Sequence, residues 1–348
     1  MEIEKINSNK RWLVTGVAGF IGSHLLEVLL KNNQTVIGLD NFLTGKRENI
    51  DDVLTHLPQE QSKQFIFVEG DIRDYKTCCD VTKDVDYVLH QAALGSIPRS
   101  LKDPLTTNEV NVTGFLNMLR ASEENKVSRF VYASSSSVYG DAQELPKIED
   151  RTGRLLSPYA TSKMANELYG HAFYHCYGIP TFGLRYFNVF GPRQDPTSMY
   201  AAVIPLWISS LIKQQPCYIN GDGSNSRDFC YVDNVVQANL KAALCENPQA
   251  YGEVFNVAFG KRTNLLELYS FIKAYLGIHK DLPPLHRENR PGDIRHSLAD
   301  IDKARHLLGY NPSYSLEEGL KITVEWFKKR SEGSDFHNAS IAKMATLV

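Results

Sequence analysis

Short apolar segments recur along the first half of the chain, and each is followed by a polar or glycine-rich segment. Three longer segments have the periodicity of helices: residues 23–30, residues 106–125 and the segment that begins near Tyr159. Strands that alternate with helices predict an α/β fold with a doubly wound parallel sheet of Rossmann type, whose ligands bind at the carboxyl ends of the strands. We predict buried strands at residues 12–15, 35–39, 65–68, 87–93, 129–133 and 181–188.

A glycine-rich turn connects the first predicted strand to the first predicted helix. Gly16, Gly19 and Gly22 have the spacing G-x-x-G-x-x-G, not the commoner G-x-G-x-x-G. Glycines at such a turn allow the backbone to approach a pyrophosphate closely, and the N-terminus of the helix that follows favours the anion. The turn therefore predicts a dinucleotide site.

An acidic residue, Asp40, ends the second predicted strand. In dinucleotide-binding folds, an acid at this place binds the hydroxyls of the adenosine ribose, and it would repel the 2′-phosphate of NADP. A helix cap or a turn is the alternative role for such a residue. Given the glycines upstream, we expect Asp40 to bind ribose, and NAD to be the cofactor.

A tyrosine and a lysine, Tyr159 and Lys163, are four residues apart in a predicted helix, so their side chains share one face. A nearby ammonium favours the phenolate, so we expect Lys163 to lower the pKa of Tyr159. The pair is a candidate for general-base catalysis on an alcohol. The spacing alone also occurs in ordinary surface helices.

Composition narrows the class of protein. Hydrophobic residues make up 43% and charged residues 22% of 348 residues, and the formal net charge is -2. These values are typical of a globular protein and give no reason to expect nucleic acid or an anionic membrane as a partner. The sequence has no membrane-length apolar run and no signal-peptide core at its start. Six scattered cysteines without metal-ligand spacing favour reduced thiols, no metal site and a cytoplasmic location.

The character of the sequence changes after Pro192, where proline, glycine and irregular polar segments become more frequent. We expect a cofactor-binding domain at residues 1–189 and about 228–260. A smaller α/β substrate domain is expected at residues 190–227 and 261–330. Residues 331–348 are expected to form a tail.

Four motifs together resemble the extended short-chain dehydrogenase/reductase family. They are the glycine turn with Thr15, the serine cluster before Val138-Tyr139-Gly140, Tyr159-x-x-x-Lys163 and residues 185–191. The resemblance extends to about Lys328 and is greatest to the nucleotide-sugar 4-epimerases. Within that group, residues 91–100, 218–223 and 295–300 are similar to UDP-N-acetylhexosamine 4-epimerases of bacterial surface-polysaccharide pathways.

The resemblance implies NAD as cofactor, a UDP-sugar as substrate and a role for each matching residue. Tyr159 would take the proton from the C4 hydroxyl of the sugar while hydride passes to NAD, Lys163 would hold the nicotinamide ribose, and Ser135 would bind the same oxygen. The remaining residues implied in cofactor binding are Gly16, Gly19, Phe20, Ile21, Gly22, Asp40, Asn41, Asp71, Ile72, Gln91, Ala92, Ala93, Asn111 and Phe187. Those implied in substrate binding are Gly95, Ser96, Ser135, Asn188, Ala202, Val203, Tyr218, Asn220, Arg227, Arg290, Asp293 and Ser297.

Related chemistries differ from epimerisation in the serine cluster. Sugar 4,6-dehydratases carry Thr-Asp-Glu in place of Ser135-Ser136-Ser137, and the decarboxylases carry glutamate at position 137. Serine hydroxyls are poor acids and bases near neutral pH, which favours epimerisation. A dehydrogenase that releases NADH is a further alternative. A non-catalytic nucleotide-binding regulator would be favoured by loss of Tyr159 or Lys163, and both residues are present.

The small residues Ser297 and Gly95 are expected to leave room for an N-acetyl group at C2 of the sugar. Glucose and galactose, or an N-acetyl uronic acid with Arg99 as its carboxylate partner, are alternatives. The family commonly dimerises through helices near 106–125 and 155–177. We therefore expect a homodimer, with Leu116, Leu119, Leu168 and Phe173 as apolar positions compatible with either that contact or packing on the sheet.

Overall fold

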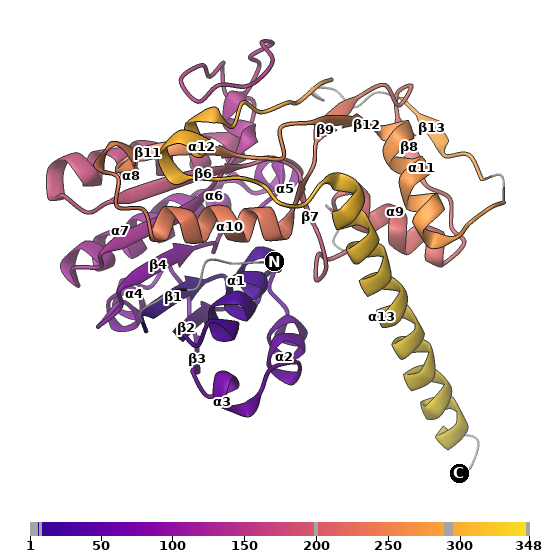
Figure 1. The fold of residues 1–348 in the computed structure, drawn as a ribbon, viewed down its shortest axis with the longest axis horizontal. Coiled ribbons are helices and arrows are strands. Elements are labelled where there is room, and N and C mark those ends of the chain that lie inside the picture. The colour runs from indigo at the N-terminus through magenta and orange to yellow at the C-terminus, as the bar shows by residue number, and fades with distance from the viewer. Residues whose placement is uncertain (1–5, 7–8, 198–200, 281, 289–294, 346–348) are drawn as a thin grey trace.

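A seven-stranded parallel sheet forms the centre of the computed structural model, which describes residues 6, 9–197, 201–280, 282–288 and 295–345, with side chains to residue 332. The strand order is β11-β6-β5-β4-β1-β2-β3 (Figure 1). The strands are β1 (Arg11–Thr15), β2 (Thr35–Asp40), β3 (Phe65–Glu69), β4 (Tyr87–His90), β5 (Arg129–Ser135), β6 (Thr181–Tyr186) and β11 (Glu253–Val257). The predicted α/β fold with a doubly wound sheet is confirmed.

Helices cover both faces of this sheet, because its central strands are apolar on both sides. One core joins the sheet to α1 (Phe20–Lys31), α2 (Arg47–Thr55), α10 (Val232–Ala243) and α12 (Asp302–Leu308). The other joins it to α4 (Tyr75–Val81), α7 (Phe115–Glu124) and α8 (Pro158–Tyr177). The shorter elements are α3 (Gln59–Ser62), α5 (Ile97–Lys102), α6 (Pro104–Asn108), a 3-10 turn at Ser136–Tyr139 and another at Pro248–Ala250.

The helix predicted at 106–125 is interrupted by a π-helical turn at Glu109–Gly114, between α6 and α7. A π turn inserts one extra residue into a helix and commonly accompanies a functional site. Here it turns Asn111 inward, where the side-chain amide bonds the backbone of Leu94.

A third core lies outside the sheet, between α9 (Val203–Ile212), α11 (Leu265–Leu276) and the first half of α13 (Leu316–Ala345). Two small strand pairs accompany these helices, β8 (Tyr218–Asn220) with β13 (Leu285–Arg287) and β9 (Ser226–Asp228) with β12 (Arg262–Asn264). Figure 1 shows this group beside the sheet, with α13 projecting away from it. The backbone of residues 331–345, expected to be a tail, continues α13 as helix.

After β9 the chain returns toward the main sheet. Strand β10 (Cys230–Tyr231) pairs with β7 (Val189–Phe190), α10 packs on the main sheet and β11 joins it. Helix α12 also packs against α10 and β11, although its residues fall in the range that the sequence assigned to the substrate domain.

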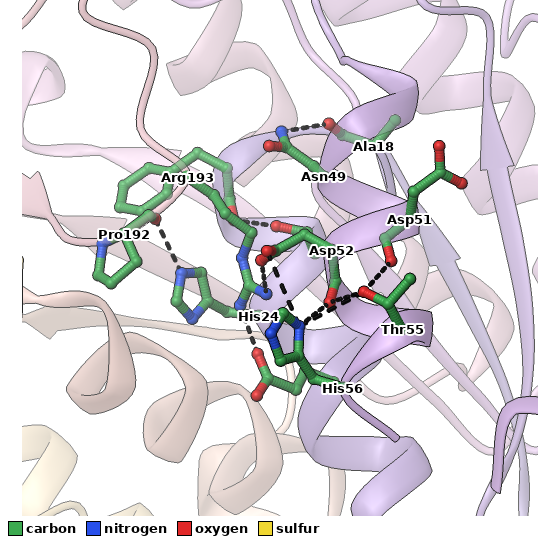
Figure 2. Close-up of polar contacts among 12 residues, drawn as sticks. Ala18, His24, Asn49, Asp51, Asp52, Thr55, His56, Pro192 and Arg193 are labelled. Atoms are coloured by element: carbon green, nitrogen blue, oxygen red, sulfur yellow. Dashed lines mark hydrogen bonds and ion pairs between the residues drawn. The ribbon is translucent and has the colours of Figure 1, made fainter. Parts of the chain in front are cut away.

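A buried arginine, Arg193, links the segment that follows β7 to helices α1 and α2. The guanidinium of Arg193 pairs with Glu27 of α1 at 2.5 Å and with Asp52 of α2 at 3.3 Å. Beside it, Nε2 of His24 donates to the carbonyl oxygen of Pro192 over 2.9 Å (Figure 2). Burial lowers the pKa of His24 to about 3, so its imidazole is neutral. The segment that follows β7 is therefore anchored to α1 and α2, the helices that follow β1 and β2.

Candidate active site

A cavity opens at the carboxyl edge of the sheet, where the loops after β1 to β4, the ends of β5 and β6, and the start of α8 converge. This is where a doubly wound sheet binds its ligand. The side chains and backbone of 25 residues line it. Fourteen of the sixteen residues expected to hold the cofactor are among them: Gly16, Gly19, Phe20, Ile21, Gly22, Asp40, Asn41, Asp71, Ile72, Gln91, Ala92, Ala93, Tyr159 and Lys163.

The glycine turn is too tight for any other residue at two positions. Gly16 has a φ of +68°, and a Cβ added there would lie 2.8 Å from the nitrogen of Ala92. A Cβ on Gly22 would lie 2.1 Å from the carbonyl oxygen of Gly16. The turn therefore presents bare backbone and the N-terminus of α1 to the cavity, as a pyrophosphate requires.

The carboxylate of Asp40 shapes the next wall of the cavity. One oxygen accepts from the backbone nitrogen of Ala18 at 2.9 Å and the other from that of Phe42 at 2.8 Å. Burial raises the pKa of Asp40, and these two hydrogen bonds act against that rise. Each oxygen retains a second lone pair, so the carboxylate can also accept from two ribose hydroxyls.

A second acid, Asp71, follows β3 at the same edge. Arg73 binds its carboxylate through Nε and Nη2, and Asn41 donates to it over 2.8 Å. The hydrogen bond from Arg73 is the main cause that lowers the pKa of Asp71 to about 2. Asp71 is therefore a charged acceptor beside the loop that carries Asn41.

Tyr159 and Lys163 reach the other end of the cavity from α8. Ser157 caps this helix by accepting from the nitrogen of Ala160 at 3.1 Å, and Pro158 occupies its first turn. Nζ of Lys163 donates to the carbonyl oxygen of Ala133 over 2.9 Å, and burial lowers the pKa of Lys163 to about 8.

The sequence predicted that the pKa of Tyr159 would lie below its ordinary value, whereas in this structure that pKa is raised. Burial raises that pKa, and the hydroxyl of Ser135 is the group that opposes the rise. The spacing of the two residues predicted their shared face, but not the depth at which the face lies.

Two residues expected to bind the cofactor do not line the cavity. Asn111 is buried and bonds the backbone of Leu94 and the hydroxyl of Ser162. Phe187 is also buried, against the ring of Tyr139. Both lie one layer behind the wall, where they support it.

The residues expected to bind substrate are distributed over more elements than those expected to bind the cofactor. Ser135 ends β5, and Gly95 lines the cavity. Arg227 and Ser297 are brought together, because Nη1 of Arg227 and the nitrogen of Ser297 both donate to the carbonyl oxygen of Ser226. Arg290 and Asp293 lie outside the described residues. The other expected residues stand at the start of α5 (Ser96), after β6 (Asn188), at the start of α9 (Ala202, Val203) and on β8 (Tyr218, Asn220).

Several lining residues were not predicted. Tyr186 is one: its hydroxyl donates to Gln91 at 3.0 Å and accepts from Asn239 at 2.9 Å, which joins two strand ends to α10. Sequence adjacency to predicted residues could have indicated most of the others. They are Leu39, Leu43, Thr44, Gly45, Gly70, Leu94, Val110, Ala133 and Ser134.

The described residues contain no group of three or more side chains that could hold a metal ion. In the same part of the chain, no helix is both long and apolar enough to cross a membrane.

Comparison with known proteins gives the family. Residues 12–258, which are most of the chain, match the family described as "NAD dependent epimerase/dehydratase family". The chain belongs to this family. The predicted membership in the extended short-chain dehydrogenase/reductase group is thereby confirmed, and NAD is the cofactor.

Relatives in the epimerase/dehydratase family span nearly the whole chain. A putative UDP-glucose 4-epimerase of Methanocaldococcus jannaschii is 38% identical over 92% of this chain and 99% of its own length. The structure of the UDP-N-acetylglucosamine 4-epimerase of Methanobrevibacter ruminantium, in complex with UDP-N-acetylmuramic acid, is 38% identical with a TM-score of 0.85, and covers 93% of this chain and 99% of its own. The structure of the UDP-glucuronic acid 4-epimerase of Bacillus cereus, solved with NAD, is 32% identical with a TM-score of 0.82. It covers 92% of this chain and 99% of its own.

The cavity fits NAD on its own geometry. The backbone at Gly16 and Gly22 leaves space that a Cβ would fill, Asp40 offers free lone pairs, and Lys163 lies at the far end beside Tyr159. Gly16 to Gly22 would hold the pyrophosphate, Asp40 the adenosine ribose and Lys163 the second ribose.

Proposed function

We propose that this protein is a UDP-sugar 4-epimerase and that its substrate is UDP-N-acetylglucosamine, which it interconverts with UDP-N-acetylgalactosamine. One observation carries the proposal. Tyr159 and Lys163 lie together at the cavity end, beside a serine cluster that offers hydroxyls but no carboxylate. The relatives named above support the reaction class.

In this reaction, Tyr159 takes the proton from the C4 hydroxyl of the sugar. It returns the proton after the 4-keto sugar has rotated to present its opposite face. Ser135 donates to the same sugar oxygen. Lys163 provides a fixed positive charge one helical turn away. When bound in the cavity, NAD supplies the hydride acceptor and donor and a cationic ring.

Because burial keeps Tyr159 protonated, a positive charge near its hydroxyl is needed to make it a base. Lys163 can supply part of it, since its ammonium is already desolvated and is held within the same wall. We therefore expect the phenolate to form only in the assembled enzyme, and not in the free protein at neutral pH.

The serine cluster separates this reaction from elimination. Ser135, Ser136 and Ser137 occupy the end of β5 and the turn that follows. Dehydration at C5 and C6 needs an acid and a base at these positions, and a serine hydroxyl near pH 7 is neither. With NAD as hydride acceptor and donor, epimerisation needs from the side chains only the tyrosine and a hydrogen-bond donor.

Room at C2 of the sugar is the argument for the N-acetylated substrate. An added Cβ on Gly95 would meet nothing within 4 Å, so the cavity wall is open there. Ser297 is small and half-buried beside Arg227, the residue expected to hold the diphosphate. UDP-glucose and UDP-glucuronate are the alternatives, because two relatives bear those names.

A second copy of the chain is the proposed partner. Leu101, Leu105 and Leu168 are exposed by 63, 77 and 66% on α5, α6 and α8, which pack against one another. Such an apolar surface is unusual on a monomer. Of the four positions suggested from the sequence, Leu119 and Phe173 are buried and cannot contribute, Leu116 is half-buried, and Leu168 is exposed. Leu168→Glu is expected to yield monomers in sedimentation.

The proposal is tested by incubating the purified protein separately with UDP-N-acetylglucosamine, UDP-glucose and UDP-glucuronate, with and without added NAD, followed by sugar NMR. The expected product is UDP-N-acetylgalactosamine, formed with the highest kcat/KM of the three reactions. Preferential conversion of UDP-glucose or UDP-glucuronate would overturn the assigned substrate but leave the reaction class intact. No C4 epimer of any substrate would overturn both.

A further inference from the structure

One face of α8 carries three ionisable side chains at intervals of one helical turn: Tyr159, Lys163 and Glu167. The first two line the cavity, whereas Glu167 is buried one turn further along, behind the wall. The reaction proposed above leaves Glu167 without a role.

Glu167 is held in a fully hydrogen-bonded cluster. Its Oε1 accepts from the hydroxyl of Ser134 at 2.5 Å and from Nε of Arg185 at 2.9 Å, and its Oε2 accepts from Nη2 of Arg185 at 2.7 Å. Arg185 is itself 3% exposed, and its third contact is the carbonyl oxygen of Glu149 at 2.8 Å. A two-point contact with a planar guanidinium fixes the orientation of the carboxylate.

Through Ser134, this cluster is attached to the catalytic end of β5. Ser134 lies between Ala133, whose carbonyl accepts from Lys163, and Ser135, whose hydroxyl is next to Tyr159. The end of β5 is thus tied to successive turns of α8. The hydrogen bond from Ser134 to Glu167 is a third link between β5 and α8. It is separate from the contact of Lys163 with Ala133 and from that of Tyr159 with Ser135.

The charge of Glu167 also acts on Lys163. Burial lowers the pKa of Lys163, and Glu167 is the group that works in the opposite direction. Two other ionisable groups lie near Lys163: Tyr159 on the same face of α8, whose pKa burial raises, and His90 on β4, whose pKa burial lowers to about 3. Arg185 on β6 is paired with Glu167.

We propose that Glu167, clamped by Arg185, is a positioning residue for the catalytic pair: it supplies the negative charge that keeps the Lys163 ammonium protonated, and it anchors the strand end that carries Ser135. The consequence for turnover rests on the proposed epimerase function. The consequence for the charge of Lys163 does not, so the two can fail separately.

The charge is tested by titrating Lys163 in protein labelled with ¹³C-lysine, with its NMR signals assigned by comparison with Lys163→Met. In Glu167→Gln, the midpoint of the Lys163 titration is expected to fall by about one pH unit or more, because a close negative charge is lost. Glu167→Asp retains the charge and should recover most of the shift. An unchanged midpoint in Glu167→Gln overturns the proposal, whether or not the protein turns over any sugar.

Removal of Glu167 alone leaves Arg185 buried without its partner, which endangers folding. The double variant Glu167→Gln/Arg185→Gln removes both charges together and is expected to lower the same midpoint. Glu149→Gln is the matched control, since Glu149 is equally buried but its carboxylate accepts from the backbone nitrogen of Asn256, and it should leave Lys163 unchanged. If Glu149→Gln shifts Lys163 as much as Glu167→Gln does, the effect is not specific to Glu167 and the proposal fails.

For turnover, kcat is measured against pH with the sugar nucleotide that the protein converts. The alkaline limb in Glu167→Gln should move to lower pH along with the Lys163 midpoint, while KM changes little. A uniform loss of kcat at every pH, with both the limb and the midpoint in place, would mean that Glu167 serves only as packing.

Discussion

The two halves of the site are built in different ways. On the cofactor side, the wall consists of strand ends and bare backbone, and its polar side chains, such as Asp40 and Asp71, are already fixed by bonds within the chain. On the substrate side, the expected residues stand on strands of three residues, β8 and β9, and Tyr218 is 39% exposed. A rigid cofactor side suits a reaction in which a ketone must turn over, because only the sugar then has to move.

The most severe way to break the cofactor side is to remove its base. Tyr159→Phe should lower kcat by at least about a hundredfold, the scale of lost general-base catalysis, because it removes the side chain expected to take the proton from the C4 hydroxyl. NAD content should stay unchanged. Tyr169→Phe, on the exposed part of the same helix, is the matched control. A near-normal rate in Tyr159→Phe would remove the tyrosine from the mechanism.

The rigidity of the glycine turn is tested by Gly22→Ala. Its new methyl group would lie 2.1 Å from the carbonyl oxygen of Gly16, so the turn must shift and the pyrophosphate site is lost. We expect the purified variant to contain less than a tenth of the NAD of the wild type, measured by chromatography after denaturation. Gly95→Ala, in the same cavity but with open space around it, should retain its NAD. Equal NAD in both variants would contradict a preformed cofactor wall.

The joint between the halves is tested by Arg193→Met. This change leaves Glu27 and Asp52 without their shared cation and should cost roughly 3 kcal/mol of unfolding free energy, measured in urea. Burial would raise the pKa of Glu27, but Arg193 and Lys31 outweigh it and lower that pKa to about 2. The stabilisation by this pair is therefore present above the ordinary pKa of glutamate and is lost as pH falls toward 2.

The difference in stability between wild type and Arg193→Met should therefore shrink between pH 5 and pH 2. Lys31→Met, which removes only the exposed partner of Glu27, is the control and should change stability by less than about 1 kcal/mol. A difference that stays constant with pH would show that the pair does not fasten the joint through charge.

The smallest expected effect is that of a substitution on the substrate side. Ser297→Tyr should narrow the space assigned to the C2 substituent and shift preference from N-acetylated to plain hexoses by about tenfold in kcat/KM. The ratio of kcat/KM for UDP-N-acetylglucosamine to that for UDP-glucose measures it. An unchanged ratio would place the C2 pocket elsewhere.

The same comparison explains what the sequence could predict. The place of Gly16, Asp40 and Tyr159 in the site could be predicted from the sequence, because sheet topology alone brings the ends of parallel strands to one edge. The support of this wall was missed, since the π turn that directs Asn111 inward and the pairing of Glu167 with Arg185 leave no periodic signal. The direction of the Tyr159 pKa was wrong because helical spacing gives a shared face but not its burial.

On the substrate side, the position of a residue depends on pairings between distant short segments, such as residue 226 with residue 297. Residue types and spacings do not encode those pairings, so family resemblance was the only guide. Arg227 and Ser297 nevertheless lie together.

The most direct measurement of the central claim uses UDP-N-acetylglucosamine that carries deuterium at C4. The purified protein is incubated with it in ordinary water, and the products are followed by NMR, mass spectrometry and absorbance at the NADH band. We predict UDP-N-acetylgalactosamine that keeps the deuterium at C4, with no net NADH. Loss of the label to water, accumulation of a ketone with NADH, or no C4 epimer would contradict it.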